Sequence, residues 1–301
     1  MNRVLISGAS GLIGSALSTQ LEAQGVQVVR LARANSQGPA SIAWDPMAKD
    51  VGAGLAASLV SGFDAVVHLA GESIAGRWTE SKKKAIRDSR VRGTRNLATA
   101  LAWAESKPKV FVCASAIGFY GDRGEEILTE QSAHGRGFLP EVCREWEEAS
   151  RIAADAGIRT VNLRTGLALS GKGGALGKTL TPFKLGLGGR IGSGQQWWSW
   201  IHIEDLAGGI QHAIATESVA GPVNMVAPKA VRNAEFTKVL ASVLGRPAIF
   251  PVPGFALGLA FGKMAAEELF LASQHVTPEK LETSGYRFQF GELRGALESL
   301  V

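Results

Sequence analysis

Three glycines near the beginning of the chain have the spacing of a phosphate-binding loop. Gly8, Gly11 and Gly14 lie in the segment 7–14, Ser-Gly-Ala-Ser-Gly-Leu-Ile-Gly, between a short apolar run and an amphipathic stretch. In such a loop one glycine makes a tight turn, one lets the backbone approach a pyrophosphate, and one lets helix and strand pack closely. The first N–H groups of the helix offer hydrogen bonds and partial positive charge to the anion. The spacing is GxxGxxG rather than GxGxxG, and its place between strand and helix predicts a dinucleotide site.

Two arginines near the end of the next predicted strand bear on the choice of dinucleotide. Sites for NAD usually place an Asp or Glu there, where the carboxylate holds the ribose hydroxyls. Residues 26–35 contain neither, and Arg30 and Arg33 stand there instead. Guanidinium groups pair well with a 2′-phosphate. We therefore predict NADP(H) rather than NAD(H), the alternative being that one arginine is merely a solvated strand end.

The histidines and cysteines do not suggest a metal centre or a disulfide framework. The five histidines are dispersed without the spacing of metal ligands, so we predict no metal site. Two cysteines, Cys113 and Cys143, are consistent with reduced thiols in a cytoplasmic protein. His202, near the predicted cleft, is the histidine proposed to contact substrate, the alternative being a structural or exposed role as for the other four.

Composition limits the classes of partner. The chain of 301 residues has a net charge of +5, and its basic residues are scattered rather than gathered in a stripe. We therefore expect no nucleic-acid partner. The chain has neither a secretory signal pattern nor an apolar run of membrane-spanning length, so we also expect no membrane partner and a cytoplasmic location.

Predicted strands alternate with predicted helices over the first half of the chain. The pattern predicts strands at 3–7, 26–31, 41–44, 64–69, 109–115 and 159–164, with helices at 12–24, 79–105 and 138–156. Such alternation is typical of an α/β fold, a Rossmann-type doubly wound parallel sheet. We assign residues 1–170 to this domain, with a later contribution from about 200–230. Residues 171–301 then form a smaller, mainly helical substrate lobe. Its glycine-rich segment 171–194 is expected to form loops, and about 250–298 a C-terminal appendix with a surface helix within 249–262.

Several longer phrases resemble one enzyme group. Val-Val-His-Leu-Ala-Gly-Glu (66–72) and Ser-Ala-Ile-Gly-Phe-Tyr-Gly-Asp (115–122) resemble the extended short-chain dehydrogenase/reductases, the relatives of sugar-nucleotide epimerases and dehydratases. Arg-Thr-Gly (164–166), the segment 182–194 and Trp-Ile-His-Ile-Glu-Asp-Leu (200–206) resemble an atypical group within them, the epimerase family proteins. The resemblance covers nearly the whole chain, including the C-terminal appendix.

The resemblance implies a set of cofactor contacts. Residues from Gly8 to Ile13 would wrap the pyrophosphate, Ala32 and Arg33 would meet the adenosine phosphate, and Arg90 replaces an Asn that reaches the cofactor in the wider superfamily. The cofactor-binding residues expected in full are Gly8, Ser10, Gly11, Leu12, Ile13, Arg30, Ala32, Arg33, Trp44 and Asp45 beside the adenine, Leu69, Ala70, Gly71 and Glu72 beside the nicotinamide ribose, Arg90 and Arg164.

The expected catalytic pair is missing. The superfamily uses a Tyr and a Lys four residues later, the Lys lowering the pKa of the Tyr. Here the two tyrosines are Tyr120 and Tyr286, and neither is followed by a Lys at that spacing. Ser115 matches the active-site Ser of the superfamily, and Tyr120 is placed near it by analogy. Glu141, on the helix that should carry the pair, is a candidate proton acceptor. These three are the catalytic candidates.

The substrate is also in question. Sugar-nucleotide enzymes grip the diphosphate with an Arg where this chain has Trp198, and a small-molecule substrate of another kind is expected. Trp198 and its neighbours Trp197 and Trp200 either offer a flat wall to that substrate or fill the core of the second lobe. Three functions remain open: an NADP(H)-dependent oxidoreductase or epimerase-like enzyme, a non-catalytic NADP(H)-binding sensor, and a nucleoside-diphosphate-sugar epimerase. Many members of the group that the chain resembles form dimers, so a homodimer is one expected state. The sequence assigns no interface to it.

Overall fold

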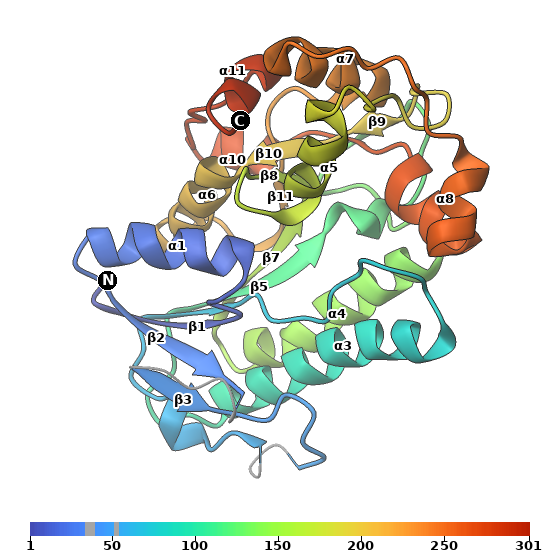
Figure 1. The fold of residues 1–301 in the computed structure, drawn as a ribbon. Coiled ribbons are helices and arrows are strands. Elements are labelled where there is room, and N and C mark those ends of the chain that lie inside the picture. Colours follow the sequence, from blue (N-terminus) through green and yellow to red (C-terminus); the bar gives the residue numbers. More distant parts are fainter. Residues whose placement is uncertain (34–39, 51–53) are drawn as a thin grey trace.

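A parallel seven-stranded sheet forms the centre of the molecule (Figure 1). The computed structural model describes residues 1–33, 40–50 and 54–301. Among these residues the strand order is β3-β2-β1-β4-β5-β7-β11, and every neighbouring pair is parallel. The strands are β1 (Arg3–Ser7), β2 (Gln27–Ala32), β3 (Ser41–Ala43), β4 (Ala65–His68), β5 (Val110–Ala116), β7 (Arg159–Thr165) and β11 (Gly221–Met225). The predicted doubly wound parallel sheet is confirmed.

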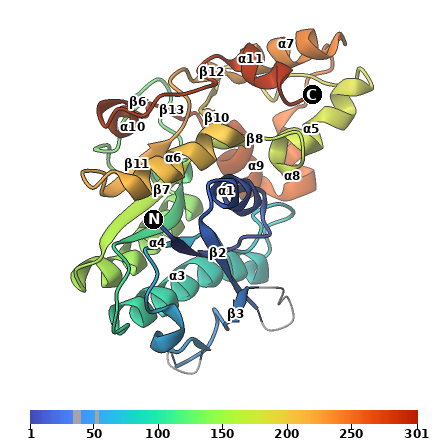
Figure 2. The ribbon, with the colours of Figure 1, turned by 90° about the vertical axis from the view of Figure 1, so that its left-hand side faces the viewer.

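Helices cover both faces of this sheet, as Figures 1 and 2 show. Helices α1 (Leu12–Ala23) and α6 (Ile203–Ala215) lie on one face, and α3 (Glu80–Ala102) and α4 (Phe138–Asp155) lie on the other. Alternation along β1 sends Val4 and Ile6 into the core beneath α1 and α6, and Leu5 into the core beneath α3 and α4. A strand buried on both faces accordingly reads as a continuous apolar run.

A second lobe packs around its own core, centred on the fully buried Trp200. It contains α5 (Gly174–Lys184), α7 (Asn233–Leu244) and α11 (Leu293–Glu298). The segment 171–194 was expected to form loops, and that expectation is wrong for α5. Leu176, Leu180 and Phe183 recur at helical spacing and are buried in this core, which stabilises the helix despite the surrounding glycines.

Short elements complete both parts. They are η2 (Ala57–Val60), η3 (Ile117–Tyr120), β6 (Ile127–Leu128), β8 (Leu167–Leu169), β9 (Trp197–Trp198), β10 (Trp200–His202), β12 (Val231–Arg232), α8 (Gly254–Phe261), α9 (Lys263–Ala266), the π-helical turn η4 (Glu267–Leu271), β13 (His275–Val276) and α10 (Glu279–Thr283). Strand β11 lies in the segment expected to return to the first domain. The domain boundary at 170 stays a prediction.

The C-terminal segment returns to the first part of the chain at α8. The expected surface helix within 249–262 is α8, on which Phe255 and Leu259 are 74% and 73% exposed. Arg77 donates from Nη1 to the Leu259 carbonyl over 2.9 Å, and the Trp78 amide donates to the Phe261 carbonyl over 3.2 Å. These bonds attach α8 to the loop that follows β4. Within the described residues no helix is both long and apolar enough to cross a membrane.

Candidate functional site

The phosphate loop requires glycine at two positions. Gly8 has φ +72°, and a Cβ there would lie 2.8 Å from the Ala70 nitrogen and the Leu69 carbonyl carbon. A Cβ on Gly14 would lie 2.2 Å from the Gly8 carbonyl oxygen. Both positions bring backbone against backbone, where a side chain cannot move aside. The loop therefore packs its backbone directly against neighbouring backbone, as the glycine spacing predicts.

Helix α1 presents unused N–H groups to the same place. Its first residue is Leu12, its first turn carries no acidic residue, and no side chain among the described residues caps it. The Gly11 amide donates a hydrogen bond to the Gly8 carbonyl over 3.0 Å, which closes the turn. Because the first N–H groups of a helix have no partner within it, those of Leu12 and Ile13 are available to an anion.

Beneath the loop, a buried hydrogen bond ties β1 to β4. Ser7 Oγ lies 2.5 Å from His68 Nδ1, and the Ala70 amide donates to Ser7 Oγ over 3.4 Å. Burial lowers the pKa of His68 to about 4, so the imidazole is neutral near pH 7. His68 Nε2 has no hydrogen-bond partner in the described part of the chain. This pair could not be predicted from local sequence patterns, because the two residues are 61 positions apart.

The two arginines expected at the cofactor separate in space. Arg30 lies within β2, and its Nη2 is 3.9 Å from Oε1 of Glu22 in the last turn of α1. Since α1 runs antiparallel to the strands, Glu22 lies at the end of the helix away from the phosphate loop. Arg33 follows Ala32 directly at the carboxyl end of β2 and is exposed. Of the two, Arg33 is therefore the one beside the ligand-binding edge.

Trp44 and Asp45 follow β3 and differ in exposure. Trp44 is only 5% exposed and meets the His68 ring edge-on at a centroid distance of 5.8 Å. Asp45 is exposed, and its Oδ1 accepts from the Met47 amide over 2.8 Å. The expected contact of these residues with an adenine stays a prediction, and the indole of Trp44 is largely taken up by core packing.

Helix α3 holds the loop after β4. Arg90 donates from Nη1 to the Glu72 carbonyl over 2.9 Å, and Lys82 Nζ lies 2.6 Å from Glu72 Oε1. A Cβ on Gly71 would lie 3.5 Å from Arg90 Cζ, while Leu69 and Ala70 are partly buried. The structure thus brings Arg90 against the expected nicotinamide side of the site.

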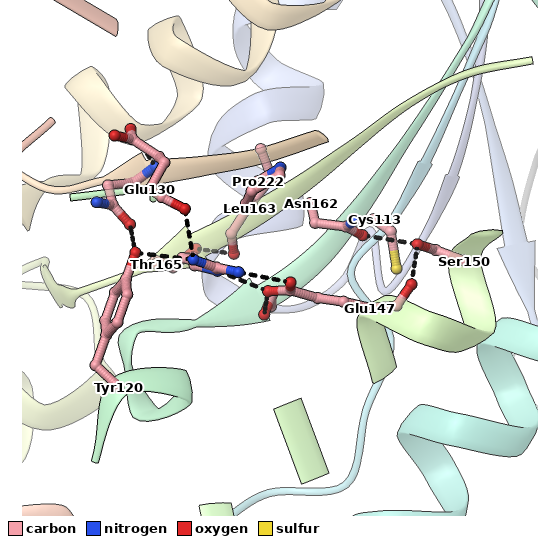
Figure 3. Close-up of polar contacts among 12 residues, drawn as sticks. Cys113, Tyr120, Glu130, Glu147, Ser150, Asn162, Leu163, Thr165 and Pro222 are labelled. Atoms are coloured by element: carbon pink, nitrogen blue, oxygen red, sulfur yellow. Dashed lines mark hydrogen bonds and ion pairs between the residues drawn. The ribbon is translucent and has the colours of Figure 1, made fainter. Parts of the chain in front are cut away.

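Ser115, Tyr120 and Arg164 belong to one buried network. Figure 3 labels two of its members, Tyr120 and Glu147. Ser115 Oγ donates to Glu147 Oε1 over 2.7 Å, and Arg164 donates to both carboxylate oxygens of Glu147 over 2.9 Å each. Arg164 Nη1 also donates to the Tyr120 hydroxyl over 3.0 Å, which in turn donates to Asn224 Oδ1 over 2.7 Å. Burial raises the pKa of Tyr120. The network leaves these groups paired with one another.

Glu147 and Asn224 are residues of this network that could not be predicted from the sequence. Arg164, the partner of Glu147, is 17 positions away from it, and β7 must lie beside β5 before the two can meet. Glu141, the carboxylate proposed from the sequence, is elsewhere: it is exposed, and its Oε2 is 3.4 Å from Arg87 Nη2. Ser115 and Tyr120 are brought together, and Glu141 does not join them.

Two apolar positions one helical turn apart face η3 from α4. A Cβ on Gly118 would lie 3.4 Å from Leu139 Cβ and 3.9 Å from Cys143 Sγ. Burial raises the pKa of the Cys143 thiol to about 12, so it stays protonated near pH 7. Neither side chain can accept a proton at neutral pH. This spacing is that of a Tyr and Lys pair, and neither of the two positions carries a base; the next turn of the helix brings Glu147, which is already bonded to Ser115 and Arg164.

Trp198 and His202 lie in the second lobe. Trp198 packs edge-on against Phe236 at 5.3 Å in the core around Trp200. His202 is buried, stacks on Phe290 at 3.8 Å, and accepts at Nδ1 from the Glu204 amide, capping α6. Burial lowers its pKa. Their expected role in substrate contact stays a prediction. Within residues 1–33, 40–50 and 54–301 no cluster of acidic, His or Cys side chains could hold a metal ion.

Comparison with known proteins identifies the family. Residues 4–226 match the model of the NAD dependent epimerase/dehydratase family, and residues 252–300 match a domain of unknown function. The chain is 40% identical to human "Epimerase family protein SDR39U1" over 303 residues, covering 99% of both chains. It is 37% identical to the Bacillus subtilis "Epimerase family protein YfhF", covering 99% of this chain and 97% of that protein.

Solved structures agree with this assignment. The crystal structure of the human protein, determined with NADPH, has a TM-score of 0.91 and 38% identity, covering 99% of this chain and 98% of that chain. A Corynebacterium glutamicum structure titled nucleoside-diphosphate sugar epimerase has a TM-score of 0.81 and 41% identity, covering 98% of this chain and 57% of that one. The phosphate loop, the parallel sheet and the C-terminal segment thus recur together, and the chain belongs to the NAD dependent epimerase/dehydratase family, in the group of the epimerase family proteins.

Proposed function

We propose that the chain binds NADP(H) at the phosphate loop and uses it as an oxidoreductase acting on a small molecule. The observation that carries the cofactor assignment is the form of the phosphate loop. Because Gly8 and Gly14 have no side chains, the loop packs directly against neighbouring backbone and turns tightly into the start of α1. The NADPH in the structure of the human relative supports the same assignment. When bound, the nicotinamide would supply or accept a hydride.

The residues of this chain would orient that cofactor. The N–H groups of Leu12 and Ile13 would bind the pyrophosphate, and Arg33 would pair with the 2′-phosphate at the carboxyl end of β2. Arg90 and the 69–72 loop would hold the nicotinamide half. The neutral His68 and Ser7 would keep the loop after β4 in register with the phosphate loop.

A second candidate is an NADP(H)-binding protein without turnover. It is supported by Leu139 and Cys143, which occupy the η3-facing positions on α4 and cannot act as base. A nucleoside-diphosphate-sugar epimerase is the third candidate. It rests on the name of the Corynebacterium relative, and it is opposed by Trp198, which stands in place of a diphosphate-binding Arg and packs into the second core.

Hydride transfer separates the first two candidates. The protein would be incubated with NADPH deuterated at C4 and a panel of small aldehydes and ketones, and deuterium in the product alcohols would be measured by mass spectrometry. The oxidoreductase assignment predicts label in at least one product. If no alcohol carries deuterium while a parallel titration shows that NADPH still binds, the result would contradict turnover. It would then favour the NADP(H)-binding protein without turnover.

A further inference from the structure

A cavity of about 360 Å³ lies at the N-terminus of α4. Its walls come from η3, from the first turn of α4 and from the π-helical turn η4 with the residues after it. Of its eleven lining residues, five lie within 252–300, the segment that matches a domain of unknown function: Glu267, Glu268, Leu271, Ala272 and Gln274. The C-terminal segment therefore completes a cavity that the dinucleotide-binding half alone would leave open.

Hydrogen bonds between distant segments hold these walls together. Glu268 accepts from the Phe138 amide over 2.9 Å and from the Leu139 amide over 2.7 Å, so it caps α4. Gln274 Nε2 donates to the Ile117 carbonyl over 3.1 Å, and the Ser273 amide donates to Asp122 Oδ1 over 3.0 Å. Each bond joins the C-terminal segment to residues more than 100 positions earlier. The cavity is thus a built feature of the fold.

The cavity adjoins the first turn of α4, the helix expected from the resemblance to carry the catalytic pair. Gly118 lines it, and this same glycine faces the side chains of Leu139 and Cys143. Gly118 also follows closely on β5, at the carboxyl edge of the sheet where ligands of α/β folds bind. A molecule in the cavity would lie on the substrate side of the proposed cofactor site.

The charges in the lining disfavour a diphosphate. The lining carries three carboxylates, Asp122, Glu267 and Glu268, against one guanidinium, Arg136. Glu268 is used in capping α4. The Glu267 side chain lies at the solvent-facing rim of the cavity, 56% exposed, and its ion-pair partner among the described residues is Lys263 at 3.9 Å. The volume is near the lower end of the range of about 300–1,000 Å³ for small-molecule pockets. Both charge and size oppose a sugar nucleotide.

We propose that this cavity is the substrate site and that it takes a small molecule carrying a protonated amine on a partly apolar, single-ring-sized body. Leu139, Pro140 and Leu271 supply apolar wall, and Glu267 supplies the counter-charge. The inference rests on the proposed function in that it assumes a substrate beside the cofactor. The site itself exists whether or not hydride is transferred.

Three probes of similar shape test the charge preference: benzylamine, benzyl alcohol and benzoate, with UDP-glucose as a fourth. Each would be titrated into isotopically labelled, NADPH-saturated protein, and backbone amide shifts at Gly118, Gly121 and Ala272 would report occupation of the cavity. We expect benzylamine to bind at least about fivefold more tightly than benzyl alcohol, benzoate to bind most weakly of the three, and UDP-glucose to leave these amides unchanged.

Two variants and a control sharpen the test. Glu267→Gln should reduce the preference for benzylamine to less than about twofold, and Arg136→Gln should strengthen benzylamine binding by removing a like charge. Arg144 is an exposed α4 residue outside the lining, so Arg144→Gln should change neither the affinity for benzylamine nor its preference over benzyl alcohol. Tighter binding of benzoate or UDP-glucose, or no shift with any probe, would overturn the proposal. A separate titration of the protein with NADPH tests the cofactor assignment independently of the cavity proposal.

Discussion

At the scale of single residues, the site depends on groups that are buried in one protonation state. His68 stands between β1 and β5, bonded to Ser7, packed against Trp44 and stacked on Phe111. Its charged form would have to lose its hydration, and no carboxylate in the described ranges compensates, so burial depresses its pKa. The hydrogen bond beneath the phosphate loop is therefore made by a neutral imidazole near pH 7.

Folding stability should fall in weak acid because of His68. The unfolded state takes up a proton near pH 6.5, whereas the folded state does so only near pH 4, so stability is lost as pH falls between these values. At about 1.4 kcal/mol per pKa unit, the whole loss is about 3 kcal/mol. Urea unfolding of the wild type and of His68→Gln, measured from pH 7 to pH 4.5, should show a shallower pH slope in the variant. Equal slopes would mean that His68 is not buried in the neutral form.

At the scale of elements, α4 is the helix on which the account of catalysis depends. One face carries Leu139 and Cys143 toward η3, and Glu147 reaches across to β5 and β7 through Ser115 and Arg164. The first turn of the same helix is capped by Glu268 from the C-terminal segment. The helix is thus held at its first turn and at its middle by residues that lie far away in the sequence.

Removal of Glu147 should destabilise the protein far more than removal of its neighbour Glu148. The Arg164 side chain is 4% exposed, so Glu147→Ala leaves a buried guanidinium unpaired at a cost of about 3–5 kcal/mol. Glu148 pairs with Arg151 where both side chains are more than 60% exposed, and Glu148→Ala should cost less than about 1 kcal/mol. Urea denaturation of both variants measures the difference. A similar loss in the two would show that the buried pair contributes no special stability.

At the scale of the whole molecule, the order of elements could be predicted from the sequence and the long-range contacts could not. Continuous apolar runs and glycine spacing are local signals, and they predicted the parallel sheet and the loop at Gly8. Helix α5 was missed because its glycines outweigh a short apolar repeat that only the second core makes stable. The Ser7–His68, Glu147–Arg164 and Glu268–Leu139 contacts each require the finished topology.

The C-terminal segment illustrates the same limit. Its position at the end of the chain gives no hint that Glu268 caps α4 or that Gln274 reaches the turn after β5. In the folded molecule α8 of this segment lies beside the dinucleotide-binding half (Figure 1). Residues 267–274 line the cavity at the N-terminus of α4. The proposed substrate site therefore depends on the whole chain, because its walls come from both the first part and the C-terminal segment.

The most direct test of the account is a comparison of NADPH and NADH binding by calorimetry. The wild type should prefer NADPH, and Arg33→Ala should weaken NADPH binding about 10- to 100-fold, the value of a charge-assisted hydrogen bond, while leaving NADH unchanged. Arg30→Ala is the matched control. It should alter neither the NADPH affinity nor the NADH affinity, because Arg30 points toward Glu22. Tighter binding of NADH than of NADPH by the wild type, or equal effects of the two substitutions, would contradict the assignment of the site.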